Sequence, residues 1–286
     1  MATRLMSGRV CLVTGATDGI GLETARQLAQ MGAAVIVVGR NPDKSATTVA
    51  KLRQQTGNVQ LEAMRADLSS QKDIRALVEQ FRGKYGRLDV LINNAAVVRM
   101  SRQESVDGIE MTFAVNHLNY FLLTNLLLDT LMTSAPSRIV NVSSALHARA
   151  KIAFDDLQFK RAYNPFTAYK HSKLANVMFT YELARRLEAK QVTVNTLHPG
   201  GVRTNLLASN GWFFRWVAQP IFDLHAISAA EGAQTSVYLA SSPEVEGVTG
   251  KYFVRCKACP SSPESYDEAA QKRLWKTSEE MTGLGS

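Results

Sequence analysis

Hydrophobic and polar positions alternate in blocks along the chain: short continuous apolar runs are each followed by a longer segment with a helical repeat. The run "AAVIVVGR" at 33–40 lacks the polar alternation of a half-exposed strand, which is typical of a strand covered on both faces. Within 19–31, Ile20, Thr24 and Leu28 recur at helical spacing on one stripe. Such regular alternation predicts a parallel sheet with helices on both sides.

The same pattern predicts a Rossmann-type, doubly wound α/β fold of about seven strands. The predicted strands are 8–14, 33–40, 59–67, 88–95, 137–144, 192–201 and 250–256. The predicted helices are 19–31, 42–56, 71–84, 105–133, 166–189, 228–241 and 264–282. Because no repeat or linker interrupts the series, we expect one domain over 1–286. Its dinucleotide-binding part covers 8–145, and its catalytic and substrate part covers 146–286.

Composition narrows the class of protein. A chain of 286 residues with 45% hydrophobic content can bury one large core. No apolar run approaches the 18 or so residues of a membrane span, and the first residues lack a signal-like apolar region, so we expect a cytoplasmic protein. Contact with a membrane surface through a patch stays open.

Charge and cysteines exclude further classes. The net charge of +8 is spread along the chain without a long basic run, which favours small anionic ligands over nucleic acid. Three cysteines are too few for a disulfide framework, and Cys256 and Cys259 have no further zinc ligands nearby in sequence. We therefore predict no metal site and two reduced thiols.

A glycine-rich turn follows the first predicted strand in "TGATDGIG". Gly15, Gly19 and Gly21 would let the backbone approach a pyrophosphate, whose charge suits the N-terminus of the following helix. A tight turn without a ligand is the alternative, but the position between a strand and a helix favours a dinucleotide site. Thr17, Asp18 and Ile20 belong to the same predicted site.

Arg40 ends the second predicted strand, where NAD-preferring sites usually carry Asp or Glu for the ribose 2′-hydroxyl. A guanidinium pairs with a 2′-phosphate, so the sequence predicts NADP(H) in preference to NAD(H). A solvated loop arginine is the alternative. Asp67 and Leu68, at the end of the third strand, are predicted to meet the adenine.

Tyr169 and Lys173 are four residues apart in "TAYKHSKLAN", at the start of a predicted helix. This spacing places both side chains on one helix face, whereas Lys170 is turned away by about 100°. Spacing alone leaves two interpretations: surface side chains, or a proton-transfer pair.

Several motifs occur in order at the predicted strand ends. They are "TGATDGIG", "NNAA" at 93–96, Asn116 in "AVNHLNYF", Ser144 at the end of "IVNVSS", "YKHSK" and "HPGGVRTNL". Together the sequence resembles the short-chain dehydrogenase/reductase family over nearly its whole length. "HSKLANVMFTYELARRL", "EGAQTSVYLASSPEVEGVTGKYF" and "KRLWKTSEEMTGL" resemble the retinol dehydrogenase branch. That branch acts on retinoids and other lipophilic alcohols and aldehydes with NADP(H).

The resemblance implies a catalytic set of four residues. Tyr169 is the general acid/base, and Lys173 binds the nicotinamide ribose and lowers the pKa of the phenol, whose ordinary value is about 10. Ser144 hydrogen-bonds the reacting oxygen, and Asn116 distorts its own helix and holds a relay water. Taken singly, a capping serine, a surface amide and an interfacial tyrosine are alternatives. Lys170 and His171 are expected to be non-catalytic.

Further cofactor contacts are expected beyond the strand ends, where such clefts open. Thr204 is placed to bond the nicotinamide carboxamide, with a helix N-cap as the alternative. Asp18 departs from relatives that carry a basic residue before the second glycine, so Arg40 carries most of the NADP prediction. The remaining predicted contacts are Asn93, Ala95, Pro199, Gly200 and Val202.

Two aromatic segments are predicted to face the substrate. The first, 145–166, carries Phe154, Phe159 and Tyr163. The second, 206–224, carries Trp212 and Phe213 and is interpreted as a lid over a hydrophobic pocket. Burial against the core or a subunit, and docking on a membrane surface, are the alternatives for the second segment.

The sequence therefore predicts an NADP(H)-dependent oxidoreductase for a hydrophobic aldehyde, ketone or alcohol, retinal-like or aliphatic. Three alternatives stay open: a nucleotide-binding regulatory protein without turnover, another short-chain dehydrogenase activity on a different carbonyl substrate, and, less favoured, an epimerase or dehydratase on a nucleotide sugar. Pairing through 105–133 and 166–189 would make a homo-oligomer.

Overall fold

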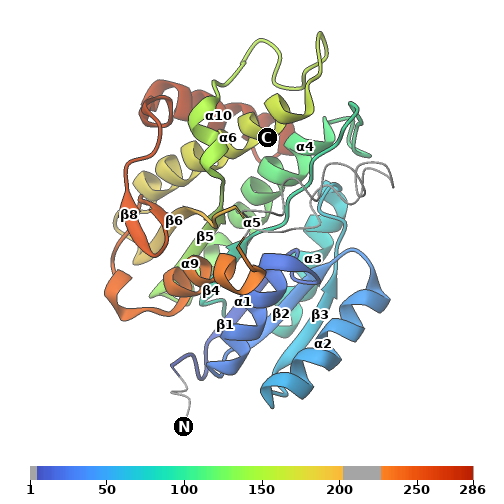
Figure 1. Cartoon of the computed structure of the whole chain (residues 1–286), viewed down its shortest axis with the longest axis vertical. Helices are drawn as coiled ribbons and strands as arrows, with labels where there is room; N and C mark the ends of the chain where they lie inside the picture. Colours follow the sequence, from blue (N-terminus) through green and yellow to red (C-terminus); the bar gives the residue numbers. More distant parts are fainter. Residues whose placement is uncertain (1–4, 202–226, 286) are drawn as a thin grey trace.

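A single twisted sheet forms the centre of the molecule in the computed structural model, which describes residues 5–201 and 227–285 (Figure 1). In the described part of the chain the strand order is β3-β2-β1-β4-β5-β6-β7-β8, parallel from β3 to β7 and antiparallel between β7 and β8. The strands are β1 Val10–Thr14, β2 Ala34–Gly39, β3 Leu61–Arg65, β4 Val90–Asn93, β5 Ser137–Val142, β6 Val192–His198, β7 Tyr252–Val254 and β8 Lys257–Cys259. This confirms the predicted Rossmann-type α/β fold.

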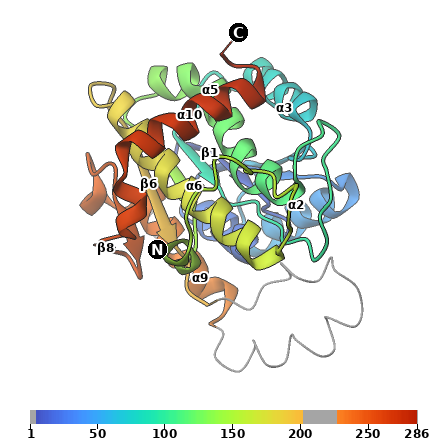
Figure 2. The ribbon, with the colours of Figure 1, turned by 90° about the horizontal axis from the view of Figure 1, so that it is seen from above.

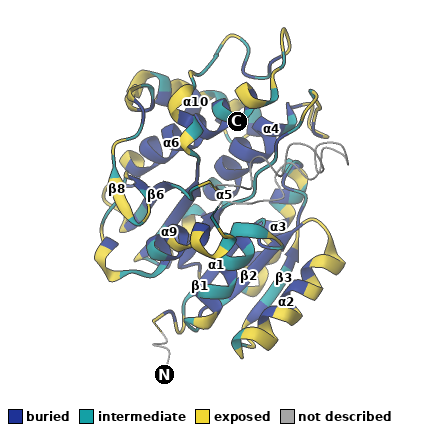
Figure 3. Ribbon diagram, in the orientation of Figure 1, coloured by how far each residue is buried: buried dark blue, intermediate teal, exposed yellow. Residues whose placement is uncertain are grey.

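Helices cover both faces of this sheet. One apolar layer joins the sheet to α1, α2 and α9, and the other joins it to α3, α5 and α6. Buried residues accordingly line the inner sides of the helices (Figure 3). The helices are α1 Gly19–Gln30, α2 Pro42–Thr56, α3 Gln71–Lys84, α4 Met111–Phe113, α5 Asn119–Thr133, α6 Pro165–Arg186, α9 Ala229–Ser241 and α10 Glu268–Thr282. Short 3-10 turns span Ala145–Arg149, Pro243–Val245 and Pro263–Tyr266.

Local capping explains where the helices begin. Asn41 accepts from the Lys44 amide and is followed by Pro42 at the start of α2. Asn164 accepts from the amides of Phe166 and Thr167 at the start of α6. These side chains satisfy N–H groups that have no acceptor within a helix, so both helices start within one residue of the prediction.

The predicted helix 105–133 is wrong in its first part. Gly108 has a φ of +73°, and Glu104 bridges Glu110, so this stretch forms a tight hairpin. Glu110 then accepts from the amides of Thr112 and Phe113 and starts the helix at Met111. The helix continues through a π-helical turn, Ala114–Leu118, before α5.

An eighth strand was not predicted. Arg255 and Cys256 form a two-residue turn with φ values of +49° and +61°, and β8 folds back on β7. Because neither residue is Gly or Asn, the sequence carried no clear hairpin signal.

Helix α10 lies across the outer sides of α5 and α6 (Figure 2). Its Trp275 ring packs edge-on against Phe121 at 4.9 Å and stacks on Phe179 at 5.8 Å between ring centroids. The predicted amphipathic helix 264–282 is thus confirmed from Glu268 onward, with Trp275 buried. Within 5–201 and 227–285, no helix combines the length and the apolar character that crossing a bilayer requires.

Candidate active site

The carboxyl ends of the parallel strands meet at one edge of the sheet, where the glycine turn leaves β1. Gly15 and Gly19 have φ values of +64° and +53°, a conformation that side chains with a Cβ rarely adopt. A Cβ on Gly21 would lie 2.5 Å from the Gly15 carbonyl oxygen. Steric demands therefore account for all three glycines, and α1 begins directly behind the turn with no acidic side chain in its first turn.

Asn94, which was not among the predicted site residues, holds this turn through hydrogen bonds. Its Nδ2 donates to the Thr14 carbonyl at 2.8 Å, and its backbone amide donates to Thr14 Oγ1 at 2.9 Å. Ala95 also donates its amide to Thr14 Oγ1, at 3.1 Å, and lies against Gly15. The only sequence signal for Asn94 was its place next to the predicted residue Asn93 in "NNAA".

Asn93, which was predicted to line the cofactor cleft, has a fully buried side chain. Its Nδ2 donates to Thr124 Oγ1 and Asn141 Oδ1, both at 2.9 Å. The side chain thus ties β4 to β5 and α5 below the cleft, because inward-facing positions of a covered strand point into the helix layer. The amide that supports the glycine turn belongs to the next residue.

The end of β2 carries a cluster of charges beside the glycine turn. Arg40 is exposed, which both a phosphate-binding group and a solvated loop arginine would show. Asp18 caps α1 by accepting from the Gly19 amide at 2.8 Å, and its other carboxylate oxygen lies 3.0 Å from Lys44 Nζ. Thr17 packs near Gly39, where a Cβ would lie 2.7 Å from its methyl group. Lys44, missed in the sequence, thus balances the charge of Asp18.

The end of β3 supplies Asp67 and Leu68. Asp67 Oδ1 accepts from the amide and hydroxyl of Ser69 at 2.9 and 2.7 Å, which fixes the carboxylate close to its own backbone. Leu68 is buried in the apolar layer with α3. Their predicted contact with adenine stays a prediction.

Tyr169 and Ser144 lie together at the mouth of the site. Their hydroxyls interact where the first turns of α6 meet the end of β5, and this interaction acts to lower the pKa of the Tyr169 phenol. Ser144 Oγ also accepts from the Leu146 amide at 3.2 Å, which leaves its own proton for a second oxygen. The structure therefore places two hydroxyl groups where one carbonyl oxygen could meet both.

Lys173 lies below Tyr169, on the same face of α6. Its ammonium donates to the Val142 carbonyl at 3.0 Å and lies 5.6 Å from the centre of the Tyr169 ring. The side chain is 1% exposed, and burial lowers the pKa of Lys173 from 10.5 to about 7. The interpretation of the pair as surface side chains is wrong.

The expected direction of the Tyr169 pKa differs in this structure. Burial raises the pKa of the phenol to about 12, against a smaller lowering by the hydrogen bond from Ser144. Removal from water disfavours the phenolate, and the Lys173 ammonium donates to the Val142 carbonyl.

Asn116 occupies the middle of the π-helical turn, so the predicted distortion of its helix is confirmed. Its Oδ1 accepts from the Val97 amide at 2.8 Å, and its Nδ2 donates to the Val97 carbonyl at 3.0 Å. Nδ2 also lies 3.1 Å from Ser172 Oγ, which donates to the Tyr169 carbonyl. Asn116 therefore links the segment after β4 to the tyrosine helix.

Several predicted residues lie at or beyond the end of β6. Gly200 has a φ of +96°, and a Cβ there would lie 2.5 Å from Ile227 Cδ1, so only glycine fits without a shift. Pro199 precedes it at the end of β6. Outside the described residues lie Val202, Thr204, Trp212, Phe213 and the predicted lid 206–224.

The structure separates the three aromatic residues predicted in the 145–166 segment. Phe159 is buried edge-on against His171 at 5.2 Å between ring centroids, so its ring holds the loop onto α6. Tyr163 donates its hydroxyl to the Arg99 carbonyl at 2.7 Å. Phe154 alone of the three lines a surface groove.

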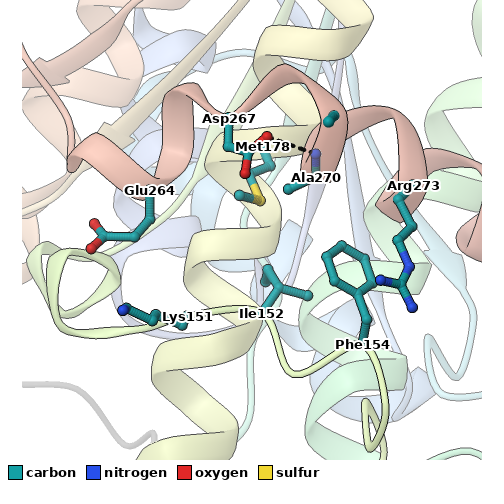
Figure 4. A pocket seen from close by; sticks show the side chains of 9 residues that line it. Lys151, Ile152, Phe154, Met178, Glu264, Asp267, Ala270 and Arg273 are labelled. Carbon is teal, nitrogen blue, oxygen red and sulfur yellow. Dashed lines mark hydrogen bonds between the residues drawn. The ribbon is translucent and has the colours of Figure 1, made fainter.

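That groove has a volume of about 540 Å³ and lies between the 151–154 segment, α6 and α10 (Figure 4). The Arg273 guanidinium lies 4.3 Å from the centre of the Phe154 ring. Ile152, Met178 and Ala270 supply apolar lining, and Lys151 and Glu264 lie at one side. Its lining includes none of the four predicted catalytic residues, so we place it apart from the candidate active site.

The described residues fit a nicotinamide dinucleotide. The first amides of α1 have no acceptor within the helix and suit a pyrophosphate. The Tyr169, Ser144 and Lys173 side chains meet at the same sheet edge, about where the other end of such a cofactor would lie. Fold and site together define the class of dinucleotide-binding α/β oxidoreductases.

Comparisons with known proteins place the chain more narrowly. Residues 9–211 match the model of the short chain dehydrogenase family. Retinol dehydrogenase 14 of Homo sapiens is 45% identical over 297 residues, covering 98% of this chain and 88% of that protein. Polyprenol dehydrogenase of Homo sapiens is 43% identical over 282 residues, covering 96% and 86%. A short chain dehydrogenase from Shigella flexneri, solved with NADP, superposes with a TM-score of 0.71 at 26% identity, covering 89% and 100%.

The chain therefore belongs to the short-chain dehydrogenase family and to its retinol dehydrogenase-like branch.

Proposed function

We propose that this protein is an NADP(H)-dependent oxidoreductase that transfers a hydride between nicotinamide and a hydrophobic aldehyde, ketone or alcohol, retinal/retinol-like or aliphatic. The observation that carries the proposal is the meeting of Tyr169, Ser144 and Lys173 at the strand edge beside the glycine turn. The names of the relatives, a retinol and a polyprenol dehydrogenase, support a lipophilic substrate.

Tyr169 acts as the proton donor in the proposed reduction. Since burial raises its pKa to about 12, the phenol carries its proton at neutral pH and can give it to a carbonyl oxygen. Ser144 donates a hydrogen bond to the same oxygen and so stabilises the negative charge that develops there. The bound nicotinamide supplies the hydride in this direction and accepts it in the other.

Lys173 and Asn116 support this proton donor. In the proposal, Lys173, which lies 5.6 Å from the centre of the Tyr169 ring, would hold the nicotinamide ribose. Asn116 holds the segment after β4 and the first turns of α6 in register, with its relay water retained as part of the hypothesis.

The charges at the end of β2 support NADP(H) over NAD(H). Arg40 is exposed at the place where a 2′-phosphate would lie, and Lys44 follows it in the first turn of α2. Because Asp18 already pairs with Lys44, its carboxylate repels a phosphate less than an isolated acid would. An acidic residue at position 18, where some NADP-preferring relatives carry a basic one, is therefore compatible with the proposal.

The direct test follows NADPH and NADH absorbance with a panel of retinal-like and aliphatic aldehydes. Turnover with NADPH, lowered in Tyr169→Phe by about 10²- to 10⁴-fold with an unchanged KM for NADPH, is the expected result. Tyr85→Phe is the matched control, because it removes a tyrosine hydroxyl that bonds Glu62 away from the site. Nucleotide binding without turnover on any carbonyl would favour the regulatory alternative.

The proposal also covers the location of the protein in the cell and its oligomeric state. We place the protein in the cytoplasm, with a membrane-surface contact near the hydrophobic substrate source as an extension. A homo-oligomer through α5 and α6 would have to use surface that α10 leaves uncovered, since Trp275 packs on both helices. Sedimentation with and without lipid vesicles tests both points.

A further inference from the structure

His147 stands three residues after Ser144 in the 3-10 turn that follows β5, and it is 2% exposed. Its Nδ1 lies 2.7 Å from the Ser144 carbonyl oxygen. Its Nε2 lies 3.1 Å from the backbone nitrogen of Ser262, more than a hundred residues further along the chain. The imidazole thus connects the predicted catalytic serine with the C-terminal segment 260–266.

These two contacts determine the tautomer. The Ser262 amide can only donate, so Nε2 must accept and carries no proton. The proton of the neutral ring therefore lies on Nδ1, which donates it to the Ser144 carbonyl. Burial lowers the pKa of His147, which agrees with a neutral ring.

The partner segment is itself held firmly. Ser261 Oγ bonds both the Tyr181 hydroxyl and Ser265 Oγ, each at 2.6 Å. The Ser265 carbonyl accepts from Gln271 Nε2 of α10, also at 2.6 Å. The Tyr252 ring of β7 lies 4.8 Å from the His147 ring and closes its other side. His147 thus joins Ser144 to a fixed part of the molecule.

We infer that His147 is a positioning residue for the proposed reaction: it anchors the Ser144 backbone to segment 260–266 and so sets where the Ser144 hydroxyl meets Tyr169 and the substrate oxygen. The inference rests on the proposed function for its kinetic consequence. The tautomer and the two hydrogen bonds do not depend on turnover.

Two substitutions each keep one of the two hydrogen bonds of the imidazole and remove the other. The Asn amide nitrogen in His147→Asn reaches the place of Nδ1 and keeps a donor for the Ser144 carbonyl. The Gln amide oxygen in His147→Gln reaches the place of Nε2 and keeps an acceptor for the Ser262 amide. Each variant loses one hydrogen bond, so the two should have similar denaturation midpoints.

The kinetic comparison is between each of these variants and wild type. Because either substitution breaks the chain of hydrogen bonds from Ser144 to Ser262, His147→Gln and His147→Asn are each expected to lower kcat about 10- to 100-fold at an unchanged KM for NADPH. Tyr181→Phe tests the same link without touching His147: it loosens segment 260–266 and should lower kcat in the same direction, by a smaller factor. A kcat within about threefold of wild type in either His147 variant, or losses that follow the folded fraction, would overturn the inference.

An activity-free measurement separates this inference from the proposed function. Imidazole ¹⁵N spectra of the wild type, with the His147 signal assigned by its absence in His147→Gln, are expected to show protonated Nδ1 and bare Nε2. Protonated Nε2 would overturn the inference whatever the enzyme assay gives. The expected tautomer in a protein without turnover on any carbonyl would refute the proposed function together with the kinetic role of His147.

Discussion

Lys44 and Asp18 form an ion pair, Nζ to Oδ2 at 3.0 Å, between the first turn of α2 and the N-cap of α1. Both side chains are about half exposed, so the pair contributes only about 0–1 kcal/mol to folding. Because the pair lies beside Arg40 and the glycine turn, we expect it to affect cofactor binding more than folding.

Removing the cations at this corner should change cofactor preference. A charge-assisted hydrogen bond contributes about 1.5–3 kcal/mol, so Arg40→Ala should raise the KM for NADPH roughly 10- to 100-fold and leave that for NADH unchanged. Lys44→Ala should act in the same direction but more weakly. Lys51→Ala, on an exposed part of the same helix, is the control. An unchanged ratio of the two KM values in Arg40→Ala would contradict the NADP(H) proposal.

Gly21→Ala should damage the dinucleotide site. The new Cβ would lie 2.5 Å from both the Gly15 carbonyl oxygen and Asn94 Nδ2, and the backbone oxygen cannot move cheaply. We expect a loss of about 1–3 kcal/mol in the free energy of unfolding and weaker nucleotide binding, measured by denaturation and calorimetry.

Gly83→Ala is the matched control for that substitution. Gly83 is exposed near the end of α3, and a Cβ there meets no atom within 4 Å. A helical glycine replaced by alanine gains up to about 1 kcal/mol, so this variant should be as stable as wild type or more so. Equal effects of the two substitutions would argue against the close packing of the glycine turn.

Lys173 should make the free energy of unfolding depend on pH. Its pKa is about 7 in the folded protein and 10.5 when unfolded, so between these values the unfolded chain binds more protons. The destabilisation by Lys173 is therefore complete below about pH 7 and is relieved as the pH rises toward 10.5. Urea denaturation at pH 7 and 9.5 should show wild type gaining stability relative to Lys173→Met. Parallel pH profiles of the free energy of unfolding in the two proteins would show that burial does not destabilise the Lys173 ammonium.

Asn116→Ala should destabilise the protein more than an ordinary amide substitution on the same helix. It leaves the partly buried amide and carbonyl of Val97 without their side-chain partners, at about 1 kcal/mol for each hydrogen bond lost. Asn125→Ala is the comparison, since Asn125 only donates to the Phe121 carbonyl one turn before it. Similar denaturation midpoints for both variants would show that the Asn116 bridge is dispensable.

Local signals were enough for most of the fold. The alternation of apolar runs and helical repeats placed β1 to β6, and it set the starts of α2 and α6 within one residue of Pro42 and Pro165. The stretch 104–110 was misassigned because its apolar and polar spacing suits a helix, while Gly108 and the Glu104–Glu110 bridge form a hairpin. The β7–β8 turn escaped prediction because Arg255 and Cys256 are unusual residues for positive φ.

The candidate site was only partly visible in the sequence. Gly15, Gly21, Tyr169 and Lys173 carry signals that depend on spacing within one or two turns. Asn94, Lys44 and His147 act through partners that are distant in sequence or on another element, and spacing does not reveal these.

The sequence by itself determined the alternating α/β order, the glycine turn and the shared helix face of Tyr169 and Lys173, because each depends on local sterics and periodicity. Tertiary structure decided the rest. It buried Lys173 and raised the pKa of Tyr169, turned Phe159 into a packing residue, and joined Ser144 to Ser262 through His147. Burial and long-range hydrogen bonds arise only when distant segments are brought together.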